Sequence, residues 1–250
     1  MPPAFATLDR PRPASRIRPD PPEPDKLPDA TKVLVVDNRP AVRSSIRCLL
    51  YGERGIGSVD DAPTAVLALR GARSQRPDVC LVSYELAESS GLILTYELKG
   101  LEQPPRVVVY ADRLDGVLAG AARVAGADGV IGSTTSGREL AQVIRRVVAG
   151  ERQFPIVTPA ALSGLASRVE AEDRPALAML VYDTPAADVA DVLGVSERWL
   201  SARRWAMLEQ FCRCPLGHRE IPSRRAQRAA GLLESGARRR SGGARASVGA

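Results

Sequence analysis

The sequence predicts an α/β domain followed by a small all-α domain, with a disordered tail at each end. Short runs of β-branched residues alternate with segments of helical spacing between about residues 31 and 150. Two more apolar-faced segments, separated by a glycine, follow between residues 172 and 214. Strands that alternate with helices favour a parallel sheet covered on both faces, so we expect a (βα)5 arrangement first and a helix-turn-helix second.

The N-terminal segment 1–30 is rich in proline, arginine and aspartate, as in "PRPASRIRPDPPEPD". It has too little apolar surface to offset the entropy lost on ordering, and we expect it to be a disordered tail. No run in the chain approaches the roughly 18 apolar residues that cross a bilayer, and the start of the chain lacks a signal-peptide pattern. These features predict a cytoplasmic protein with no membrane partner.

Five segments are strand candidates. The strongest are "KVLVVD" at 32–37, "VCLV" at 79–82 and "RVVVY" at 106–110, because each is a continuous apolar or β-branched run. "GVIG" at 129–132 is weaker, and "GIGSV" at 55–59 is the poorest of the five.

Five segments with helical spacing lie after these strands. They are "AVRSSIRCLLY", "PTAVLALRGA", "SGLILTYELKG", "VLAGAARVAGA" and "GRELAQVIRRVVAG". In the last of them, apolar residues form one stripe along the helix: Leu140, Val143, Ile144, Val147 and Val148. The first domain is therefore assigned to residues 31–150.

The second domain has the start and stop signals of two helices joined by a tight turn. Residues 151–171 are interpreted as a linker with a lead-in helix, and residues 172–214 as the helix-turn-helix. Thr184 is expected to cap a helix that has Pro185 in its first position, and Gly194 to end that helix. Ser196 is expected to cap the next helix, which runs to about Phe211.

The order of these elements, with "RPDVCLV", "AGADGVIG", "VIRRVVAGE" and "ADVADVLGVSERWL", resembles response regulators of the NarL/FixJ type. Such proteins join a flavodoxin-like (βα)5 receiver domain to a LuxR-type helix-turn-helix, so the resemblance implies this fold for residues 31–150. The resemblance covers about residues 31–211. It implies a DNA-binding transcriptional regulator that acts as a homodimer on double-stranded DNA, typically for a pathway of secondary metabolism or development.

The resemblance also implies where a phosphorylation site should stand, and this chain departs from it. In receivers an aspartate at the end of the third strand accepts a phosphoryl group, and neighbouring carboxylates help to hold Mg²⁺. The matching positions here are Asp37, Asn38, Ser83, Ala111 and Ser133. With one carboxylate and no lysine, this set predicts a degenerate phosphoacceptor pocket with no metal and no cofactor.

Ser83 has three interpretations at this stage. It is a small polar residue that fills the space of a lost phosphorylation pocket, or it is phosphorylated by another kinase, which adds about −1.5 to −2 charges at neutral pH. A small-molecule ligand at the receiver, in place of phosphorylation, is the third. The first is favoured because no cluster of arginines lies near Ser83 in the sequence.

In the LuxR-type pattern, the second helix of the motif enters the major groove. Ser196 begins this helix, and Leu200 takes a buried position in it. The residues that the resemblance places toward DNA are Arg198, Ser201, Ala202, Arg203, Arg204 and Trp205. Arginines suit phosphates and guanine edges, although an ordinary charged helix face and packing tryptophans are the alternatives.

The chain carries a formal charge of +6, and much of the excess lies near its C-terminus. Residues 215–250 are interpreted as a flexible basic tail that adds non-sequence-specific attraction to phosphates. Cys212, Cys214 and His218 lie close together, but they lack a fourth ligand and the usual spacing of a zinc site.

These features bear on three possible functions. The leading one is a DNA-binding regulator whose degenerate receiver is not controlled by aspartyl phosphorylation. The alternative is a protein-interaction module whose helical domain no longer reads DNA, favoured by the loss of the customary lysine at Ser201 and by Arg204 at an apolar position. An enzyme is not expected, because no nucleophile, base or phosphate loop forms a catalytic set.

Overall fold

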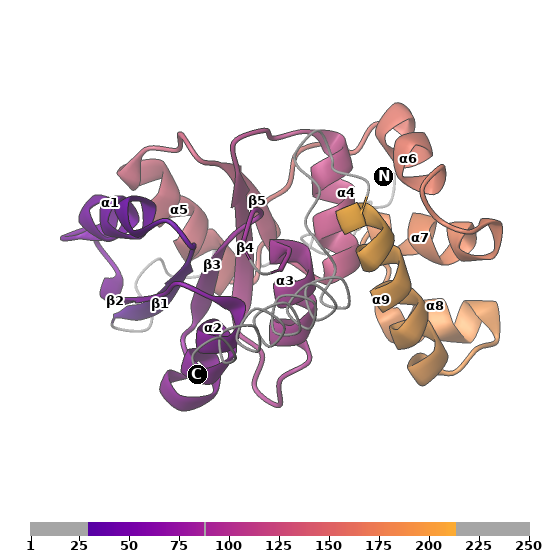
Figure 1. Cartoon of the computed structure of the whole chain (residues 1–250), viewed down its shortest axis with the longest axis horizontal. Helices are drawn as coiled ribbons and strands as arrows, with labels where there is room; N and C mark the ends of the chain where they lie inside the picture. The colour runs from indigo at the N-terminus through magenta and orange to yellow at the C-terminus, as the bar shows by residue number, and fades with distance from the viewer. Residues whose placement is uncertain (1–29, 88, 214–250) are drawn as a thin grey trace, which may run out of the picture.

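A computed structural model describes residues 30–87 and 89–213 of the chain. Its centre is a five-stranded parallel sheet with the strand order β2-β1-β3-β4-β5 (Figure 1). The strands are β1 Thr31–Val36, β2 Ile56–Ala62, β3 Val79–Ser83, β4 Arg106–Ala111 and β5 Gly129–Gly132. The predicted α/β class and the five strands are confirmed, and the poorest candidate, β2, is the longest strand because it continues to Ala62.

Each strand is followed by a helix, as the spacing predicts. The helices are α1 Pro40–Leu50, α2 Ala65–Gln75, α3 Gly91–Lys99, α4 Gly116–Ala125 and α5 Gly137–Val148. Side chains start three of them by accepting a backbone N–H: those of Thr64, Ser90 and Asp115. Ser136 and Glu139 begin α5 with reciprocal hydrogen bonds of the capping-box type.

The two faces of the sheet are covered by different helices. On one face, Ile46 and Leu50 of α1 and Ile144 of α5 pack against the sheet. On the other face, α2 and α3 pack through small and branched side chains such as Ala68 and Leu94. The fully buried strand β3 lies between these layers, which explains its continuous apolar sequence.

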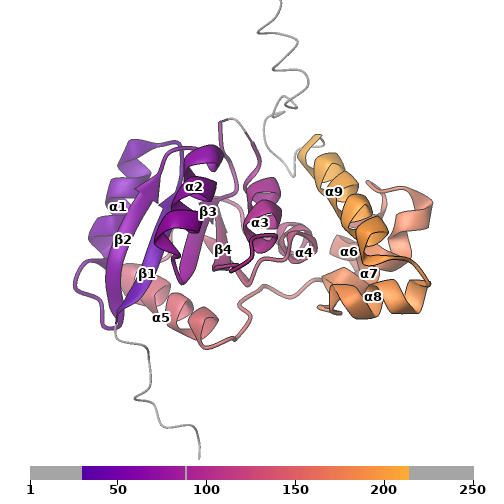
Figure 2. The same ribbon diagram turned by 90° about the horizontal axis from the view of Figure 1, so that it is seen from below.

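Residues 159–213 form a helical unit beside the sheet domain. It consists of α6 Pro159–Ala166, the short 3-10 helix η1 Ala171–Asp173, α7 Arg174–Val181, α8 Ala186–Leu193 and α9 Glu197–Arg213. Figure 2 shows this unit placed against α4, with α9 running alongside α3 and α4. Within the described part of the chain, no helix is both long and apolar enough to cross a membrane.

The start of α8 differs from the prediction. Thr184 does not cap the helix: its backbone N–H donates to the carbonyl of Met179 at 3.0 Å and so closes the end of α7. Pro185 is the cap residue, with an extended ψ of 143°, and the helix begins one residue later. The predicted end at Gly194 is confirmed, because Gly194 has a φ of 65° in the left-handed region that glycine adopts easily.

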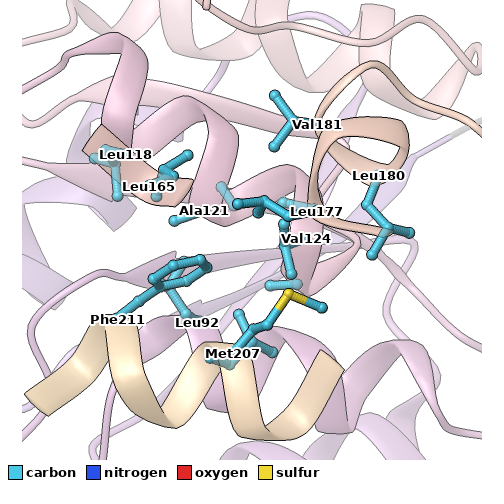
Figure 3. Close-up of a cluster of buried hydrophobic side chains, with 14 of the residues drawn as sticks. Leu92, Leu118, Ala121, Val124, Leu165, Leu177, Leu180, Val181, Met207 and Phe211 are labelled. Atoms are coloured by element: carbon cyan, nitrogen blue, oxygen red, sulfur yellow. The ribbon is translucent and has the colours of Figure 1, made fainter. Parts of the chain in front are cut away.

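The core does not stop at the boundary between the two parts. One cluster of buried apolar side chains includes Leu92 of α3, Val124 of α4, Leu165 of α6, Leu177 of α7 and Phe211 of α9 (Figure 3). The predicted linker region contains α6, which packs on α4. The predicted tails, except Ala30, and Cys214 and His218 lie outside the described residues.

Candidate functional site

Asp37 is the centre of a hydrogen-bonded cluster at the carboxyl ends of the strands. Its side chain lies directly after β1 and is fully buried. The guanidinium of Arg39 donates to both carboxylate oxygens, with Nε at 3.1 Å and one terminal nitrogen at 3.0 Å. The backbone N–H of Arg39 adds a third donor at 2.7 Å, and the hydroxyl of Tyr110 adds a fourth at 2.7 Å.

These donors keep Asp37 ionised although it is buried. Burial by itself raises the pKa of Asp37, because it removes water from the charged form. The hydrogen bonds from Arg39 and Tyr110 outweigh burial, so the pKa of Asp37 lies below its usual value. Burial and the neighbouring carboxylate raise the pKa of Tyr110, which therefore remains a neutral hydrogen-bond donor.

Ser83 lies beside this cluster, at the end of β3. The strand pairing places Ser83 opposite Tyr110, and Val82 opposite Val36, the residue before Asp37. The hydroxyl of Ser83 is buried and donates to the carbonyl of Glu85 at 2.9 Å. The pocket lined by Ser83, Tyr110 and Ala111 has a volume of about 20 Å³, which is space for about one water molecule.

The other predicted pocket residues lie around the same strand ends. Ala111 ends β4 and is buried, and the backbone N–H of Ser133 donates to its carbonyl at 2.9 Å. Asn38 and Ser133 are exposed, and neither contributes a carboxylate. The structure thus brings Asp37, Ser83 and Ala111 together and leaves Asn38 and Ser133 on the surface beside them.

Arg39 is the functional residue that sequence reasoning missed, together with the hydroxyl of Tyr110. The signal for Arg39 is the run "DNRP": Pro40 begins α1, so the residue two positions after the aspartate turns back toward it. The signal for Tyr110 is a phenol at the end of an otherwise aliphatic buried strand, since a buried hydroxyl requires a hydrogen-bond partner.

The helix-turn-helix pair is formed by α8 and α9. Ser196 caps α9, as predicted, because its hydroxyl accepts the backbone N–H of Trp199 at 3.1 Å. Val189 of α8 and Leu200 of α9 are buried between the helices. The tight turn that includes Gly194 therefore fixes one helix against the other.

Arg203 faces inward rather than toward solvent. Its guanidinium forms two hydrogen bonds with the buried carboxylate of Asp173, at 2.6 and 2.7 Å, and a further ion pair with Glu172. The hydrogen bonds to Asp173 raise the pKa of Arg203. This residue holds α9 to the start of α7, and its role in DNA contact stays a prediction.

Ser201, Arg204 and Trp205 face the sheet domain. The guanidinium of Arg204 donates to the carbonyl of Val124 at 2.7 and 3.1 Å and lies 5.2 Å from the ring centre of Tyr96. Tyr96 also donates to the carbonyl of Ser201 and meets the indole of Trp205 edge to face. The side chain of Arg204 is partly buried, and its charged end contacts the sheet domain.

Arg198 and Ala202 remain on the outer face of α9. Both are exposed, and Arg198 makes no hydrogen bond or ion pair with any other residue in the described ranges. Of the residues predicted to contact DNA, Ser196, Arg198, Ser201 and Ala202 are exposed in this arrangement, and among these four Ser201 is the one that contacts Tyr96 of the sheet domain.

The two parts of the molecule share a continuous apolar interface. Met207, Leu208 and Phe211, in the second half of α9, are fully buried. Figure 3 shows Met207 near Val124 of α4, and Phe211 near Leu92 of α3. Gly120 allows the helices to approach closely, since a Cβ atom at this position would lie 2.5 Å from a methyl group of Leu165.

Comparison with known proteins agrees with the fold. Residues 33–145 match the response regulator receiver domain family. A Pseudomonas aeruginosa protein named as a transcriptional regulator is 31% identical over 125 residues, which span 50% of this chain and 60% of that protein. The BvgA transcription regulator of virulence factors from Bordetella pertussis is 23% identical over 189 residues, 72% of this chain and 90% of BvgA.

Among solved structures, a two-component response regulator of the LuxR family from Aurantimonas sp. SI85-9A1 is 25% identical. The match has a TM-score of 0.47 and covers 55% of this chain and 96% of that one. The parallel sheet, its strand order and the family match agree on the same segment. Residues 33–145 therefore match the response regulator receiver domain family and have the flavodoxin-like fold of such domains.

Proposed function

We propose that the protein is a DNA-binding transcriptional regulator whose receiver domain is not controlled by aspartyl phosphorylation. The observation that carries this proposal is the Asp37 carboxylate, whose oxygens are taken up by Arg39 and Tyr110 beside a serine at the acceptor position. The α8–α9 pair and the relatives named as transcription regulators support the DNA-binding part.

Aspartyl phosphorylation needs a carboxylate that attacks phosphorus and a Mg²⁺ ion held by further carboxylates. Ser83 supplies a hydroxyl in place of the nucleophile, and that hydroxyl already donates to Glu85. The guanidinium of Arg39 stands against Asp37 where a metal ion would have to bind.

We extend the proposal to the DNA that is bound. A helix-turn-helix reads half-sites in the major groove, so a homodimer on double-stranded DNA follows from the two-fold arrangement of such sites. The resemblance favours a pathway-specific regulator of secondary metabolism or development. In this account α9 enters the groove with the exposed face that carries Arg198 and Ala202.

Genomic footprinting with the intact protein tests DNA binding, followed by gel shifts on the recovered site. We expect Arg198→Ala to weaken specific binding by about tenfold or more, because one arginine contact to a base contributes about 1–3 kcal/mol. Arg70→Ala is the matched control, since it removes the same charge from the exposed surface of α2. Equal affinity of both variants contradicts the assignment of α9 to DNA.

Phosphorylation is tested separately with beryllofluoride and acetyl phosphate in the presence of Mg²⁺. We expect no change in mass, oligomeric state or amide spectrum of the wild-type protein, because Asp37 has no free oxygen for the metal. Ser83→Asp alone is also expected to show no response to these reagents, because Arg39 still pairs with Asp37. Ser83→Asp combined with Arg39→Ala leaves the carboxylates at positions 37 and 83 free of Arg39, and this double variant should bind Mg²⁺. Stoichiometric Mg²⁺ on the wild-type protein contradicts the proposal.

The docked position of α9 favours a second candidate function. Ser201, Arg204 and Trp205 contact the receiver domain, so the helical unit in this alternative is an interaction module that does not read DNA. The footprinting experiment separates the two functions: complete absence of protected sites favours the interaction module, and a defined operator favours the regulator.

A further inference from the structure

A second cavity lies between α1 and the β5–α5 connection, and nothing in the proposed function uses it. Its volume is about 330 Å³, within the range of about 300–1,000 Å³ typical of small-molecule sites. Arg39, Tyr110 and Asp112 border both this cavity and the smaller pocket beside Ser83. The larger of the two spaces therefore adjoins the predicted phosphoacceptor position without including Ser83.

The walls of this cavity are mainly aliphatic. The apolar side chains that line it are Val42, Ile46, Leu49, Leu81, Ile131 and Leu140. Leu49 is 43% exposed although it belongs to this apolar lining. Covering such a surface with an apolar ligand removes it from water, which stabilises the complex by about 25 cal/mol per Å².

A few polar groups stand at the same cavity. The hydroxyls of Ser45 and Ser133 line it, and neither forms a side-chain hydrogen bond with another described residue. Thr135 donates to the carbonyl of Gly132 at 2.7 Å and keeps its oxygen as an acceptor. These groups are suited to hydroxyl or carbonyl groups on a ligand, because each can donate or accept.

The charges near the cavity disfavour an anion. Arg39 is the positive group in the lining, and its guanidinium is already paired with Asp37. Asp112 adds a negative charge that forms no close ion pair with another described residue, although the charge of Arg39 attracts it. A negatively charged ligand would thus meet the carboxylate of Asp112, and the guanidinium in the lining is already paired with Asp37.

We infer that this cavity binds an uncharged, mainly apolar small molecule that carries hydroxyl or carbonyl groups. The inference rests on the proposed function in one respect, since such a ligand gives an input to a receiver that phosphorylation does not control. Binding itself depends only on the cavity and is measured without DNA. Failure of DNA binding therefore leaves this inference standing, and absence of ligand binding leaves DNA recognition standing.

Probe binding to the full chain tests the inference, with naphthalen-1-ol as the neutral probe and naphthalene-1-sulfonate as its anionic counterpart. Calorimetry should show saturable binding of naphthalen-1-ol with a dissociation constant below about 100 µM, within the efficiency of small ligands. The sulfonate should bind at least about tenfold more weakly, because it brings a charge toward Asp112. Non-saturable binding of the neutral probe, or equal affinity of both, overturns the inference.

A pair of matched variants fixes the location. Ser45→Phe fills the cavity from the exposed side of α1 and should weaken naphthalen-1-ol binding at least about tenfold. Ser74→Phe places the same ring on the exposed surface of α2 and should leave the affinity unchanged. Shifts of the backbone amides of Ile131 and Leu140 on titration check the site in the wild-type protein.

The outcome of the variants also distinguishes a ligand from a second copy of the chain. Unchanged probe binding in Ser45→Phe places the probe elsewhere and overturns the inference. If the wild-type protein does not bind the probe and Ser45→Phe converts a dimer into a monomer, the cavity belongs to the subunit interface and the inference is wrong. Probe binding that disappears in Ser45→Phe at an unchanged oligomeric state supports it.

Discussion

Asp37 is a buried carboxylate whose charge is balanced by hydrogen-bond donors of the protein itself. Arg39 provides a bidentate guanidinium and a backbone N–H, and Tyr110 provides a hydroxyl, so each oxygen of the carboxylate has partners. Burial of a charge is tolerated when it is paired and hydrogen-bonded in this way. Asp37 therefore has a structural role here, as the link between β1, the start of α1 and β4.

Arg39→Gln removes the charge that faces Asp37 and should destabilise the protein at neutral pH by about 1.5–3 kcal/mol. The pKa of Asp37 is lowered in the folded protein, so its contribution is fully present above the usual carboxyl pKa of about 3.9 and is lost as the pH falls further. The difference between wild type and variant should therefore be large at neutral pH and shrink in acid. Urea unfolding across this pH range measures it.

Arg113→Gln is the control for this measurement, because Arg113 lines the same small pocket but is largely exposed and distant from its partner Asp115. It should change the free energy of unfolding by less than about 1 kcal/mol at every pH. A difference between wild type and Arg39→Gln that grows as the pH falls would contradict the assigned role of Arg39.

Sequence reasoning predicted a changed phosphoacceptor position at Ser83 but did not predict the contact between Arg39 and Asp37. The prediction for Ser83 needs only the comparison of one position with a family pattern, and Ser83 ends a strand that is a clear apolar run. The contact of Arg39 depends on the direction that its long side chain takes just before Pro40 begins α1, and residue spacing alone does not fix that direction. A partner such as Arg39 is found only by asking which residues donate hydrogen bonds to the buried carboxylate.

The helices were predicted best where local chemistry decides their ends. Gly194 and Ser196 define the turn between α8 and α9 through backbone conformation and a cap, and both predictions are confirmed. The prediction that Thr184 caps α8 is wrong. The backbone N–H of Thr184 donates to Met179 at the end of α7, and the local sequence pattern does not indicate this contact. The orientation of α9 could not be predicted from the sequence either, since the pattern does not show whether Arg203 faces solvent or pairs with Asp173.

The pairing of Arg203 with Asp173 should decide how firmly α9 is held. Asp173→Asn leaves the guanidinium against a neutral amide and should cost about 1.5–3 kcal/mol, because Asp173 is only 1% exposed. Glu172→Gln is the matched control: it pairs with the same arginine from the surface and should cost less than about 1 kcal/mol. Equal effects of the two variants in urea unfolding would contradict a dominant role for Asp173.

The receiver domain and the helical unit are joined by packing as well as by the chain. Seven of the residues of α4 are buried: Leu118, Ala119, Gly120, Ala121, Ala122, Val124 and Ala125. A helix that is apolar almost all round indicates burial on both sides, so "VLAGAARVAGA" carried a signal for a second contact surface. The partner of that surface was not predictable, because α6, α7 and α9 reach it from positions far along the sequence.

A shared core predicts that both parts unfold together. Phe211→Ala should lower the free energy of unfolding by about 3–5 kcal/mol, since the ring is fully buried between the two parts. Both tryptophans lie in α9, so their emission reports on the helical unit, while amide exchange in β3 reports on the sheet. We expect the two transitions to coincide in the wild type and to shift together in the variant.

Val192→Ala is the control, because Val192 is 71% exposed on α8 and its truncation should change stability by no more than about 0.5 kcal/mol. Separate transitions for the helical unit and the sheet, in the wild-type protein, would show that the interface is too weak to couple them.

The counter-charge of Asp37 is covalently attached to the protein two residues away. Unlike a bound ion, it cannot be chelated, diluted or exchanged for another metal, and its local concentration does not follow the mineral content of the cell. The charge state at these strand ends should consequently be the same in EDTA as in millimolar magnesium. Under the proposed function, the receiver would therefore be insensitive to fluctuations in divalent cations.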